Sequence, residues 1–326
     1  MTLRLLVTGG CGFIGVNLIA ALQQHGGYEI TVIDDESLGD RRHVEPFGVR
    51  FVPGDIRDDA KLAEALQGQH AVVHLAADTR VIDSIERPQY NFDVNVVGSF
   101  KLLEACRAHA VSRVVAASTG GAILGEVPAP VHENMVPEPA APYGASKLAM
   151  EGYLSAFAGS YGMRCSALRF SNIYGPRSFH KGSAIAHFFK QILKNEPLVV
   201  YGDGSQVRDF LFVEDLVEGI RRALESQSTG VFQLGSGRPT SLSTLIDLIR
   251  SVTGQPDFSV CYEAFRQGEL HTTWCDISKA QTAFGFDPQT QLHEGLSRTW
   301  QWFLDYSGLG AASGEGGRTT PITAAL

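Results

Sequence analysis

The sequence has few cysteines. Its 326 residues include five, and they form neither a disulfide framework nor a zinc-ligand spacing. The five are scattered along the chain: Cys11, Cys106, Cys165, Cys261 and Cys275. An odd, scattered set is typical of a reducing compartment. We therefore expect a cytoplasmic protein, and we expect no bound metal.

Long apolar runs and clusters of positive charge are also missing. No apolar run approaches the length of a membrane span. The formal net charge is −8, and the longest basic run is Arg41-Arg42-His43. We therefore expect neither a membrane nor nucleic acid as a partner. An apolar strand is predicted to begin at Leu3, so we expect no signal peptide.

A glycine-rich turn lies between the first predicted strand and the first predicted helix. Residues 3–7 are apolar, and an apolar helix begins near Phe13 and Ile14. Three glycines at a spacing of three connect them: Gly9, Gly12 and Gly15. Such a turn lets backbone N–H groups approach a pyrophosphate, and the positive end of the helix faces it. The pattern predicts dinucleotide binding.

A carboxylate follows the second predicted strand. This strand, residues 29–33, ends in Asp34, nineteen residues after Gly15. At that distance an acidic side chain can bind the adenosine ribose 2′-OH. A 2′-phosphate would meet the same carboxylate, so the sequence favours NAD over NADP.

The next predicted elements supply further candidates. Asp55 is either an adenine ligand or the N-cap of a helix over residues 58–66. A strand over residues 71–77 contains His74, which we expect to be packed in the sheet. A long helix is predicted over residues 88–110, with Asn95 beside its core stripe. The expected members of that stripe are Phe92, Val96, Phe100 and Leu103.

A tyrosine and a lysine, Tyr143 and Lys147, lie one helical turn apart at the start of another predicted helix. A nearby ammonium favours phenolate, so the tyrosine pKa is expected to fall and the side chain to act as a base. A predicted strand that ends in Ser118 and Thr119 supplies hydroxyls for the same substrate.

Strands and helices alternate in the first half, which predicts a doubly wound, parallel α/β sheet of the Rossmann type. We assign residues 1–171 to an NAD-binding domain, with return segments near 206–235. Residues 172–305 mainly form a smaller α/β substrate-binding domain over the carboxyl ends of the strands. Residues 307–326 are rich in Gly, Ala, Ser and Thr and are predicted to be a disordered tail.

With these motifs, and with Arg169-Phe170-Ser171-Asn172-Ile173-Tyr174-Gly175-Pro176, the chain resembles the extended short-chain dehydrogenase/reductases over residues 3–305. Within them it is most similar to the NAD-dependent nucleotide-sugar epimerases and dehydratases, and above all to the UDP-glucose 4-epimerases. The resemblance implies 4-epimerisation of a UDP-sugar through a transient 4-keto sugar. It also implies a homodimer formed through the helix over 88–110 and the Tyr143 helix.

The resemblance assigns roles to individual residues. Tyr143 is the base, Lys147 its activator, and Thr119, or else Ser118, the hydroxyl partner. The cofactor positions are Gly9, Gly12, Phe13, Ile14, Gly15, Asp34, Asp55, Ile56, Leu75, Ala76, Ala77, Asn95, Ser118, Tyr143 and Lys147. The substrate positions are Ser84, Thr119, Asn172, Tyr201, Arg208, Arg266, Glu269 and Thr273.

The chain also departs from the family pattern. Gly120 occupies the usual hydroxyl position, which moves that role to Thr119. Gly120-Gly121-Ala122 lacks the acids and bases that related sugar dehydratases and decarboxylases carry there, so both activities are less favoured. The intact Tyr143 and Lys147 pair speaks against a non-catalytic NAD-binding protein. Thr273 stands where hexose-restricted members hold a tyrosine, which predicts that N-acetyl sugars are also accepted. Uronate 4-epimerisation stays open, because Arg177, His180 or Lys181 could receive a carboxylate.

Overall fold

The computed structural model describes residues 2–265 and 270–309. Its central feature is a sheet of seven strands that all pair in parallel, in the order β10-β6-β5-β4-β1-β2-β3. The strands are β1 (Leu3–Thr8), β2 (Tyr28–Asp34), β3 (Arg50–Pro53), β4 (Ala71–His74), β5 (Arg113–Thr119), β6 (Arg164–Phe170) and β10 (Gly230–Leu234). The order reverses between β1 and β4, which is where ligands bind in such sheets. The predicted doubly wound parallel sheet is confirmed.

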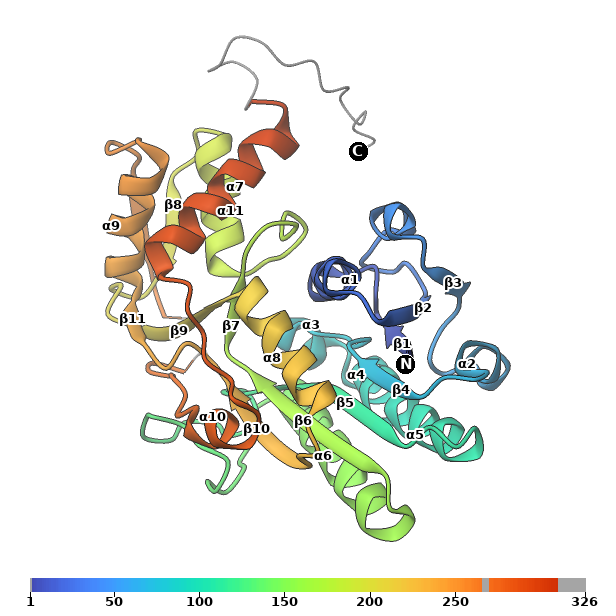
Figure 1. The fold of residues 1–326 in the computed structure, drawn as a ribbon. Coiled ribbons are helices and arrows are strands. Elements are labelled where there is room, and N and C mark those ends of the chain that lie inside the picture. The colour runs from blue at the N-terminus through green and yellow to red at the C-terminus, as the bar shows by residue number, and fades with distance from the viewer. Residues whose placement is uncertain (1, 266–269, 310–326) are drawn as a thin grey trace.

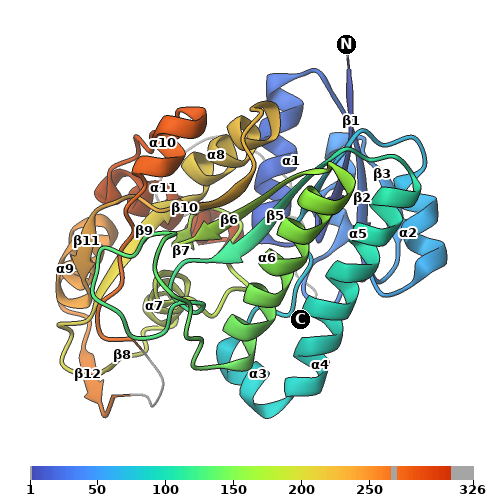
Figure 2. The same cartoon turned by 90° about the horizontal axis from the view of Figure 1, so that it is seen from below.

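Helices cover both faces of the sheet (Figure 2). One face carries α1 (Phe13–His25) and α8 (Val213–Glu225), which pack on each other. The other carries α2 (Asp59–Leu66), α5 (Ser99–Ala108) and α6 (Pro142–Tyr161). Each layer has its own apolar core. Since the central strands are buried on both sides, they read as continuous apolar runs, as Leu5, Leu6 and Val7 of β1 do.

Short helices follow β2 and β4. They are η1 (Arg41–His43), η2 (Glu45–Phe47), α3 (Val81–Glu86), α4 (Pro88–Phe92) and η3 (Asp93–Gly98). The predicted helix over 88–110 is thus α4, η3 and α5 in succession, and η3 is a π-helical turn. The expected core stripe is only half right. Val96 and Leu103 are buried, but Phe92 is 51% exposed and Phe100 is 39% exposed.

The second half of the chain builds a smaller α/β unit beside the sheet (Figure 1). Its strands are β7 (Asn172–Tyr174), β9 (Val207–Phe212) and β11 (Pro239–Ser241) in one sheet, with β8 (Leu198–Tyr201) and β12 (Val260–Glu263) in another. Its helices are α7 (Ala184–Leu193), α9 (Leu242–Thr253) and α11 (Leu292–Ser307), whereas α10 (Ser278–Phe284) packs against β10 of the central sheet. A third apolar core includes Phe189, Trp300 and Phe303. Ser307, where the disordered tail was predicted to begin, is the last residue of α11, and residues 310–326 lie outside the described part.

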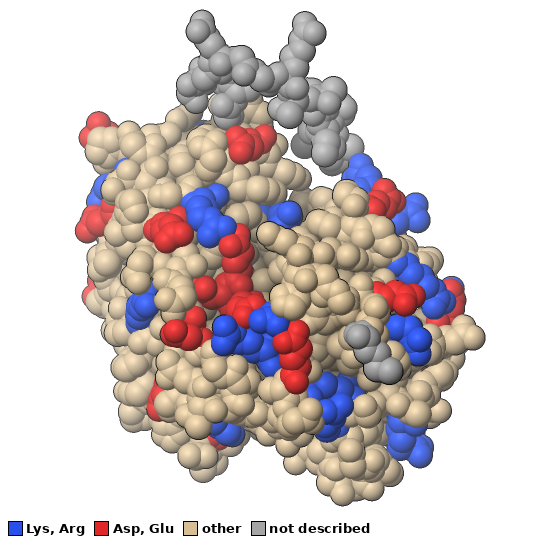
Figure 3. All heavy atoms as spheres, viewed as in Figure 1, with Lys and Arg blue, Asp and Glu red and all other residues tan. Residues whose placement is uncertain are grey.

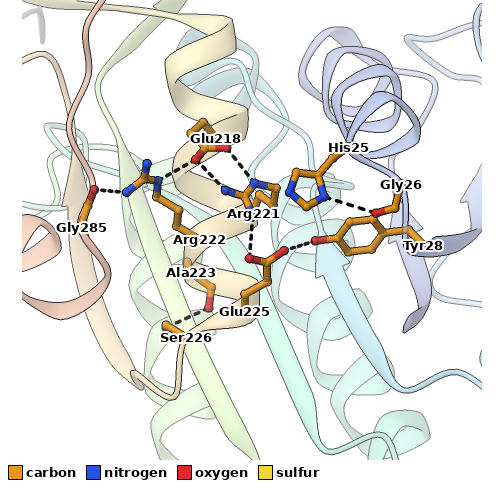
Figure 4. A network of polar contacts seen from close by, with 10 residues as sticks. All are labelled: His25, Gly26, Tyr28, Glu218, Arg221, Arg222, Ala223, Glu225, Ser226 and Gly285. Atoms are coloured by element: carbon orange, nitrogen blue, oxygen red, sulfur yellow. Dashed lines mark hydrogen bonds and ion pairs between the residues drawn. The ribbon is translucent and has the colours of Figure 1, made fainter. Parts of the chain in front are cut away.

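A network of ion pairs holds α8 against its neighbours (Figure 4). Glu218 binds Arg221 at 2.7 Å and Arg222 at 2.6 Å. Arg221 also binds Glu225, which accepts a hydrogen bond from the Tyr28 hydroxyl on β2. Arg222 donates to the carbonyl that follows α10. The network therefore connects α8 to β2 in the first half of the chain and to the residue after α10 in the second half.

Three further features bear on the sequence predictions. None of the helices in the described residues is long and apolar enough to cross a membrane. The five cysteines, all within the described part, are free thiols. Residues 2–265 and 270–309 contain no group of three or more His, Cys, Asp or Glu side chains that could hold a metal ion.

Candidate active site

A large cleft of about 3300 Å³ lies along the carboxyl ends of the central strands and is bordered by the smaller unit. Most of the predicted site residues line it. On the sheet side they are Gly9, Gly12, Phe13, Ile14, Gly15, Asp34, Asp55, Ile56, Leu75, Ala76, Ala77, Ser118, Thr119, Tyr143 and Lys147. From the second half come Asn172, Tyr201, Arg208 and Thr273. One cavity thus contains both the predicted cofactor site and the predicted substrate site.

The glycine turn is shaped by close backbone contacts. Gly9 has a φ of +68°, and a Cβ there would lie 2.6 Å from the backbone nitrogen of Ala76. A Cβ on Gly15 would lie 2.6 Å from the carbonyl oxygen of Gly9. Gly12, which has no side chain, takes the N-cap position of α1. The N-terminus of α1 is therefore open to a ligand, and its N–H groups and dipole suit a diphosphate.

Asp34 is buried at the end of β2 and lines the cleft. Its carboxylate accepts hydrogen bonds from the backbone N–H groups of Cys11, at 2.9 Å, and Glu36, at 2.8 Å. Burial nonetheless raises the pKa of the carboxyl group. The side chain is thus fixed between the glycine turn and the β2 end, where a ribose hydroxyl would reach it.

Asp55 and Ile56 line the cleft beside this position. The N-cap alternative for Asp55 is wrong, because Asp58 accepts the bonds from the first turn of α2. Asp55 instead forms an ion pair with Arg57, which holds the pKa of the Asp55 carboxyl below its usual range. Both oxygens already accept hydrogen bonds from Arg57, so an adenine amino group would have to share this carboxylate with the arginine.

Asn95 is buried and connects the loop after β4 to the Tyr143 helix. Its Oδ1 accepts from the Asp78 N–H at 2.8 Å, and its Nδ2 donates to the Asp78 carbonyl at 2.9 Å. The same Nδ2 donates to the Ser146 hydroxyl at 3.0 Å, which donates to the carbonyl of Tyr143. Asn95 is not among the described residues that line the cleft. Its contacts position the loop and the catalytic helix.

His74 is packed within the sheet, as predicted, and is only 3% exposed. Its Nδ1 lies 2.7 Å from the hydroxyl of Thr8, and its Nε2 lies 2.9 Å from the hydroxyl of Ser99. Burial lowers the pKa of His74 to about 3. The ring is therefore neutral at physiological pH and joins the end of β1 to α5.

Tyr143 and Lys147 both line the cleft from the first turns of α6. Lys147 donates to the carbonyl of Ala117 at 3.0 Å, and burial lowers its pKa to about 8. Burial, with a contribution from Asp78, raises the pKa of Tyr143 to about 12. The expectation that Lys147 lowers the tyrosine pKa is wrong for the protein alone, since burial and the charge of Asp78 both disfavour the phenolate.

The two candidate hydroxyls at the end of β5 differ in their surroundings. The Ser118 hydroxyl donates to Glu151 at 2.6 Å. Thr119 is half-buried and lines the cleft. A Cβ on Gly120 would lie 2.9 Å from the Gln233 side chain, so a hydroxyl at position 120 would be crowded. The geometry favours Thr119 as the hydroxyl that meets a substrate.

The substrate positions are held by the small unit. The Asn172 amide donates to the Asp209 carbonyl at 3.3 Å, and Arg208 donates to the carbonyl of His271. The N–H of Thr273 donates to the carbonyl of Val207, which places Thr273 beside the Arg208 strand.

Three predicted substrate residues do not line the cleft or cannot be placed. Ser84 is fully buried and is not among the described residues that line the cleft. Its hydroxyl accepts from the Tyr143 N–H at 3.1 Å, so it supports the catalytic helix instead. Arg266 and Glu269 lie outside the described residues.

Sequence reasoning overlooked two acidic residues near the catalytic pair. Asp78 lines the cleft and raises the pKa of Tyr143. Glu151 forms a buried ion pair with Arg169. Glu151 had a sequence signal, because it follows Lys147 by four residues on the same helix face. Asp78 had none.

The fold and this arrangement of residues define a nucleotide-binding enzyme of the short-chain dehydrogenase/reductase type. The model of the NAD dependent epimerase/dehydratase family matches residues 5–235. The chain belongs to this family.

Individual relatives match almost the whole chain. A UDP-glucose 4-epimerase from Mycolicibacterium smegmatis is 36% identical over 317 residues, which cover 94% of this chain and 100% of the relative. The crystal structure of UDP-glucose 4-epimerase from Thermotoga maritima with UDP-glucose has a TM-score of 0.89 at 34% identity, covering 94% and 100%. UDP-glucuronic acid 4-epimerase from Bacillus cereus, in complex with UDP-glucuronic acid and NAD, has a TM-score of 0.85 at 29% identity, covering 93% and 99%.

Proposed function

We propose that the protein is an NAD-dependent 4-epimerase of UDP-sugars that interconverts UDP-glucose and UDP-galactose through a transient 4-keto sugar. The observation that carries the proposal is the shared cleft, in which Tyr143, Lys147 and Thr119 lie beside the glycine turn of α1. Relatives that match the whole chain are named for this activity.

The residues on the sheet side fit NAD. The open N-terminus of α1 suits the diphosphate, and the fixed Asp34 carboxylate suits an unphosphorylated adenosine ribose. Leu75, Ala76 and Ala77 border the middle of the cleft with small or apolar side chains. When bound, NAD supplies a hydride acceptor for the sugar and a positive charge that favours the Tyr143 phenolate.

The catalytic roles follow from position. Tyr143 takes the proton from the sugar 4-OH and returns it after the 4-keto sugar has turned over. Thr119 holds the same oxygen by a hydrogen bond. Lys147 stays protonated beside the tyrosine and orients the nicotinamide ribose. The reaction ends with the cofactor in its starting oxidation state, so no outside oxidant or reductant is needed.

The second half of the chain binds the nucleotide diphosphate. Arg208 and Asn172 line the cleft and suit phosphate oxygens. Tyr201 suits stacking on the base. For Arg266 and Glu269 the roles in diphosphate and ribose binding stay predictions.

The contacts of Arg177 and Lys181 support a neutral hexose over a uronate. Arg177 donates to Asn17 on α1 at 2.8 Å, and the Lys181 ammonium lies 5.7 Å from the centre of the Phe13 ring. Both cations thus lie against α1, on the cofactor side of the cleft. UDP-glucuronate remains the alternative substrate, because a relative of 29% identity acts on it.

We also propose a homodimer formed through α4, α5 and α6, in which α4 and α5 follow each other end to end and lie beside α6 (Figure 2). Four aromatic side chains on these helices are between 39% and 53% exposed: Phe92, Phe100, Tyr153 and Tyr161. The rings of Phe100 and Tyr153 form an edge-to-face pair with their centres 5.2 Å apart, which joins α5 to α6. Exposed aromatic surface of this kind is typical of an interface. The cytoplasmic location stays a prediction.

One experiment tests the reaction and the substrate class together. The purified enzyme is incubated separately with UDP-glucose, UDP-N-acetylglucosamine and UDP-glucuronate, and the products are identified by proton NMR. Formation of UDP-galactose supports the proposal. Conversion of UDP-glucuronate alone would establish the alternative, and a 4-keto-6-deoxy product would show a dehydratase.

A further inference from the structure

A buried ion pair lies directly behind the catalytic residues. The Glu151 carboxylate binds Arg169 through two hydrogen bonds of 2.9 and 2.7 Å. The side chains are 5% and 3% exposed, respectively. Ser118 donates to the same carboxylate at 2.6 Å. Of these three residues only Ser118 belongs to the described residues that line the cleft, so the ion pair supports the site from behind and is not a ligand of the substrate.

The pair adjoins Lys147 from two directions. Glu151 follows Lys147 by one turn of α6, so both side chains point to the same side of the helix. Lys147 donates to the carbonyl of Ala117 on β5, and Ser118, the next residue of that strand, donates to Glu151. Two adjacent residues of the strand are therefore fixed by two adjacent turns of the helix.

Charged and titratable groups face Lys147 from each element packed around it. They are Tyr143 and Glu151 on α6, His74 on β4, Asp78 after β4 and Arg169 on β6. His74 is neutral at physiological pH. Asp78 acts on Tyr143. Glu151 supplies the negative charge that opposes the loss of the Lys147 proton on burial.

We propose that Glu151 is a positioning residue that keeps Lys147 protonated and holds the Ser118 hydroxyl at the buried ion pair, which leaves Thr119 as the hydroxyl that meets the sugar. Arg169 binds the same carboxylate, so its positive charge offsets part of the effect of Glu151 on Lys147. The inference rests on the proposed function for the role of Lys147 in catalysis, but the charge of Lys147 can be measured independently.

The test compares Glu151→Gln with Glu218→Gln, each in the full-length enzyme. Glu218 also binds two arginines but lies on α8 (Figure 4) and is not among the described residues that line the cleft. The side-chain signal of Lys147, assigned from its loss in Lys147→Met, is titrated by carbon NMR. In Glu151→Gln the titration midpoint should fall by about 1 pH unit, and the alkaline limb of kcat should fall with it. Glu218→Gln should leave both unchanged. An unchanged midpoint in folded Glu151→Gln would overturn the proposal.

A second variant protects the test against misfolding. Arg169→Gln leaves the carboxylate without its guanidinium, so the Lys147 midpoint should rise, opposite to the shift in Glu151→Gln. A fall in this variant would contradict the proposal even if Glu151→Gln does not fold. If the wild-type enzyme converts no UDP-sugar, the proposed function fails, while the titration still decides the role of Glu151.

Discussion

Gly121 packs directly against Thr273 at the wall of the cleft. A Cβ on Gly121 would lie 3.2 Å from the hydroxyl oxygen of Thr273. The two residues come from the turn after β5 and from the segment beside Arg208, and both line the cleft. Both are small, so neither extends a long side chain into the pocket.

The first prediction is broad sugar specificity. Because Thr273 is smaller by an aromatic ring than the tyrosine of hexose-restricted relatives, the pocket should admit an N-acetyl group at C2. Wild-type enzyme should epimerise UDP-N-acetylgalactosamine as well as UDP-galactose, and Thr273→Tyr should lose the first activity and largely keep the second. Rates on both substrates, measured by NMR, check this. Wild-type enzyme that ignores UDP-N-acetylgalactosamine at millimolar concentration would show that other side chains fill the space.

The second prediction concerns the proton acceptor. Tyr143→Phe should abolish turnover but retain NAD, since only the phenolic oxygen is lost. Activity is measured with UDP-galactose, and bound NAD is measured after denaturation of the purified variant. A variant that still turns over substrate would refute the role of Tyr143.

The third prediction separates the two hydroxyls of β5. Thr119→Val should lower kcat by roughly 10- to 1,000-fold, the range for losing one polar contact in a transition state. Ser118→Ala removes the bond to Glu151 and should mainly cost stability, about 1 kcal/mol. Steady-state kinetics and thermal melts of both variants are the measurements. The assignment is reversed if Ser118→Ala alone reduces kcat to that extent.

The fourth prediction concerns the oligomer. Phe92 on α4 is 51% exposed, and Phe92→Lys should shift the protein from dimer to monomer at micromolar concentration, because the charge would be buried in the interface. Tyr262, which is 57% exposed on β12, offers a control: Tyr262→Lys should stay dimeric. Light scattering after size-exclusion chromatography gives both masses. A monomeric wild-type protein would exclude the proposed interface.

The fifth prediction concerns acid stability. Hydrogen bonds from Arg221 and Arg222 lower the pKa of Glu218 from an ordinary value of 4.5 to about 2. A depressed pKa stabilises the fold above the unfolded value, and this contribution is lost as pH falls from about 4.5 toward 2. The wild-type Tm should therefore exceed that of Glu218→Gln at pH 7, and the difference should shrink across that window. Since Glu218 is partly exposed, salt should also reduce the difference. A difference that does not change with pH would contradict the linkage.

The sequence predicted the sheet, and most of the residues that it proposed for the cofactor line one cleft, because both depend on local patterns. The glycine spacing, the acidic end of β2 and the tyrosine–lysine pair each lie within one short segment. The fold then brings these segments to one edge because the strands are parallel. Such features can be read without tertiary structure.

The predictions were wrong where burial by segments distant in the sequence decides a pKa or the exposure of a side chain. Burial raises the pKa of Tyr143 to about 12, which no spacing of residues reveals. Phe92 and Phe100 had helical periodicity but face outward, and hydrophobic spacing alone cannot distinguish a core face from an exposed apolar face. The role of Asn95 came from its partners on two other segments.

The π turn η3 connects α4 to α5 and sets how far one is rotated relative to the other about the helix axis. Each residue of a helix advances the next by about 100°, and a π turn contains one residue more than an α turn. The segment before η3 is thereby phased to the loop of Asp78, while α5 directs Phe100 toward Tyr153. Deleting one residue from η3 would rotate α4 relative to α5 by about 100°. The contact of α4 with the Asp78 loop and the contact of Phe100 with Tyr153 could then not both form. The deletion should therefore destabilise the fold more than any single substitution in the same turn.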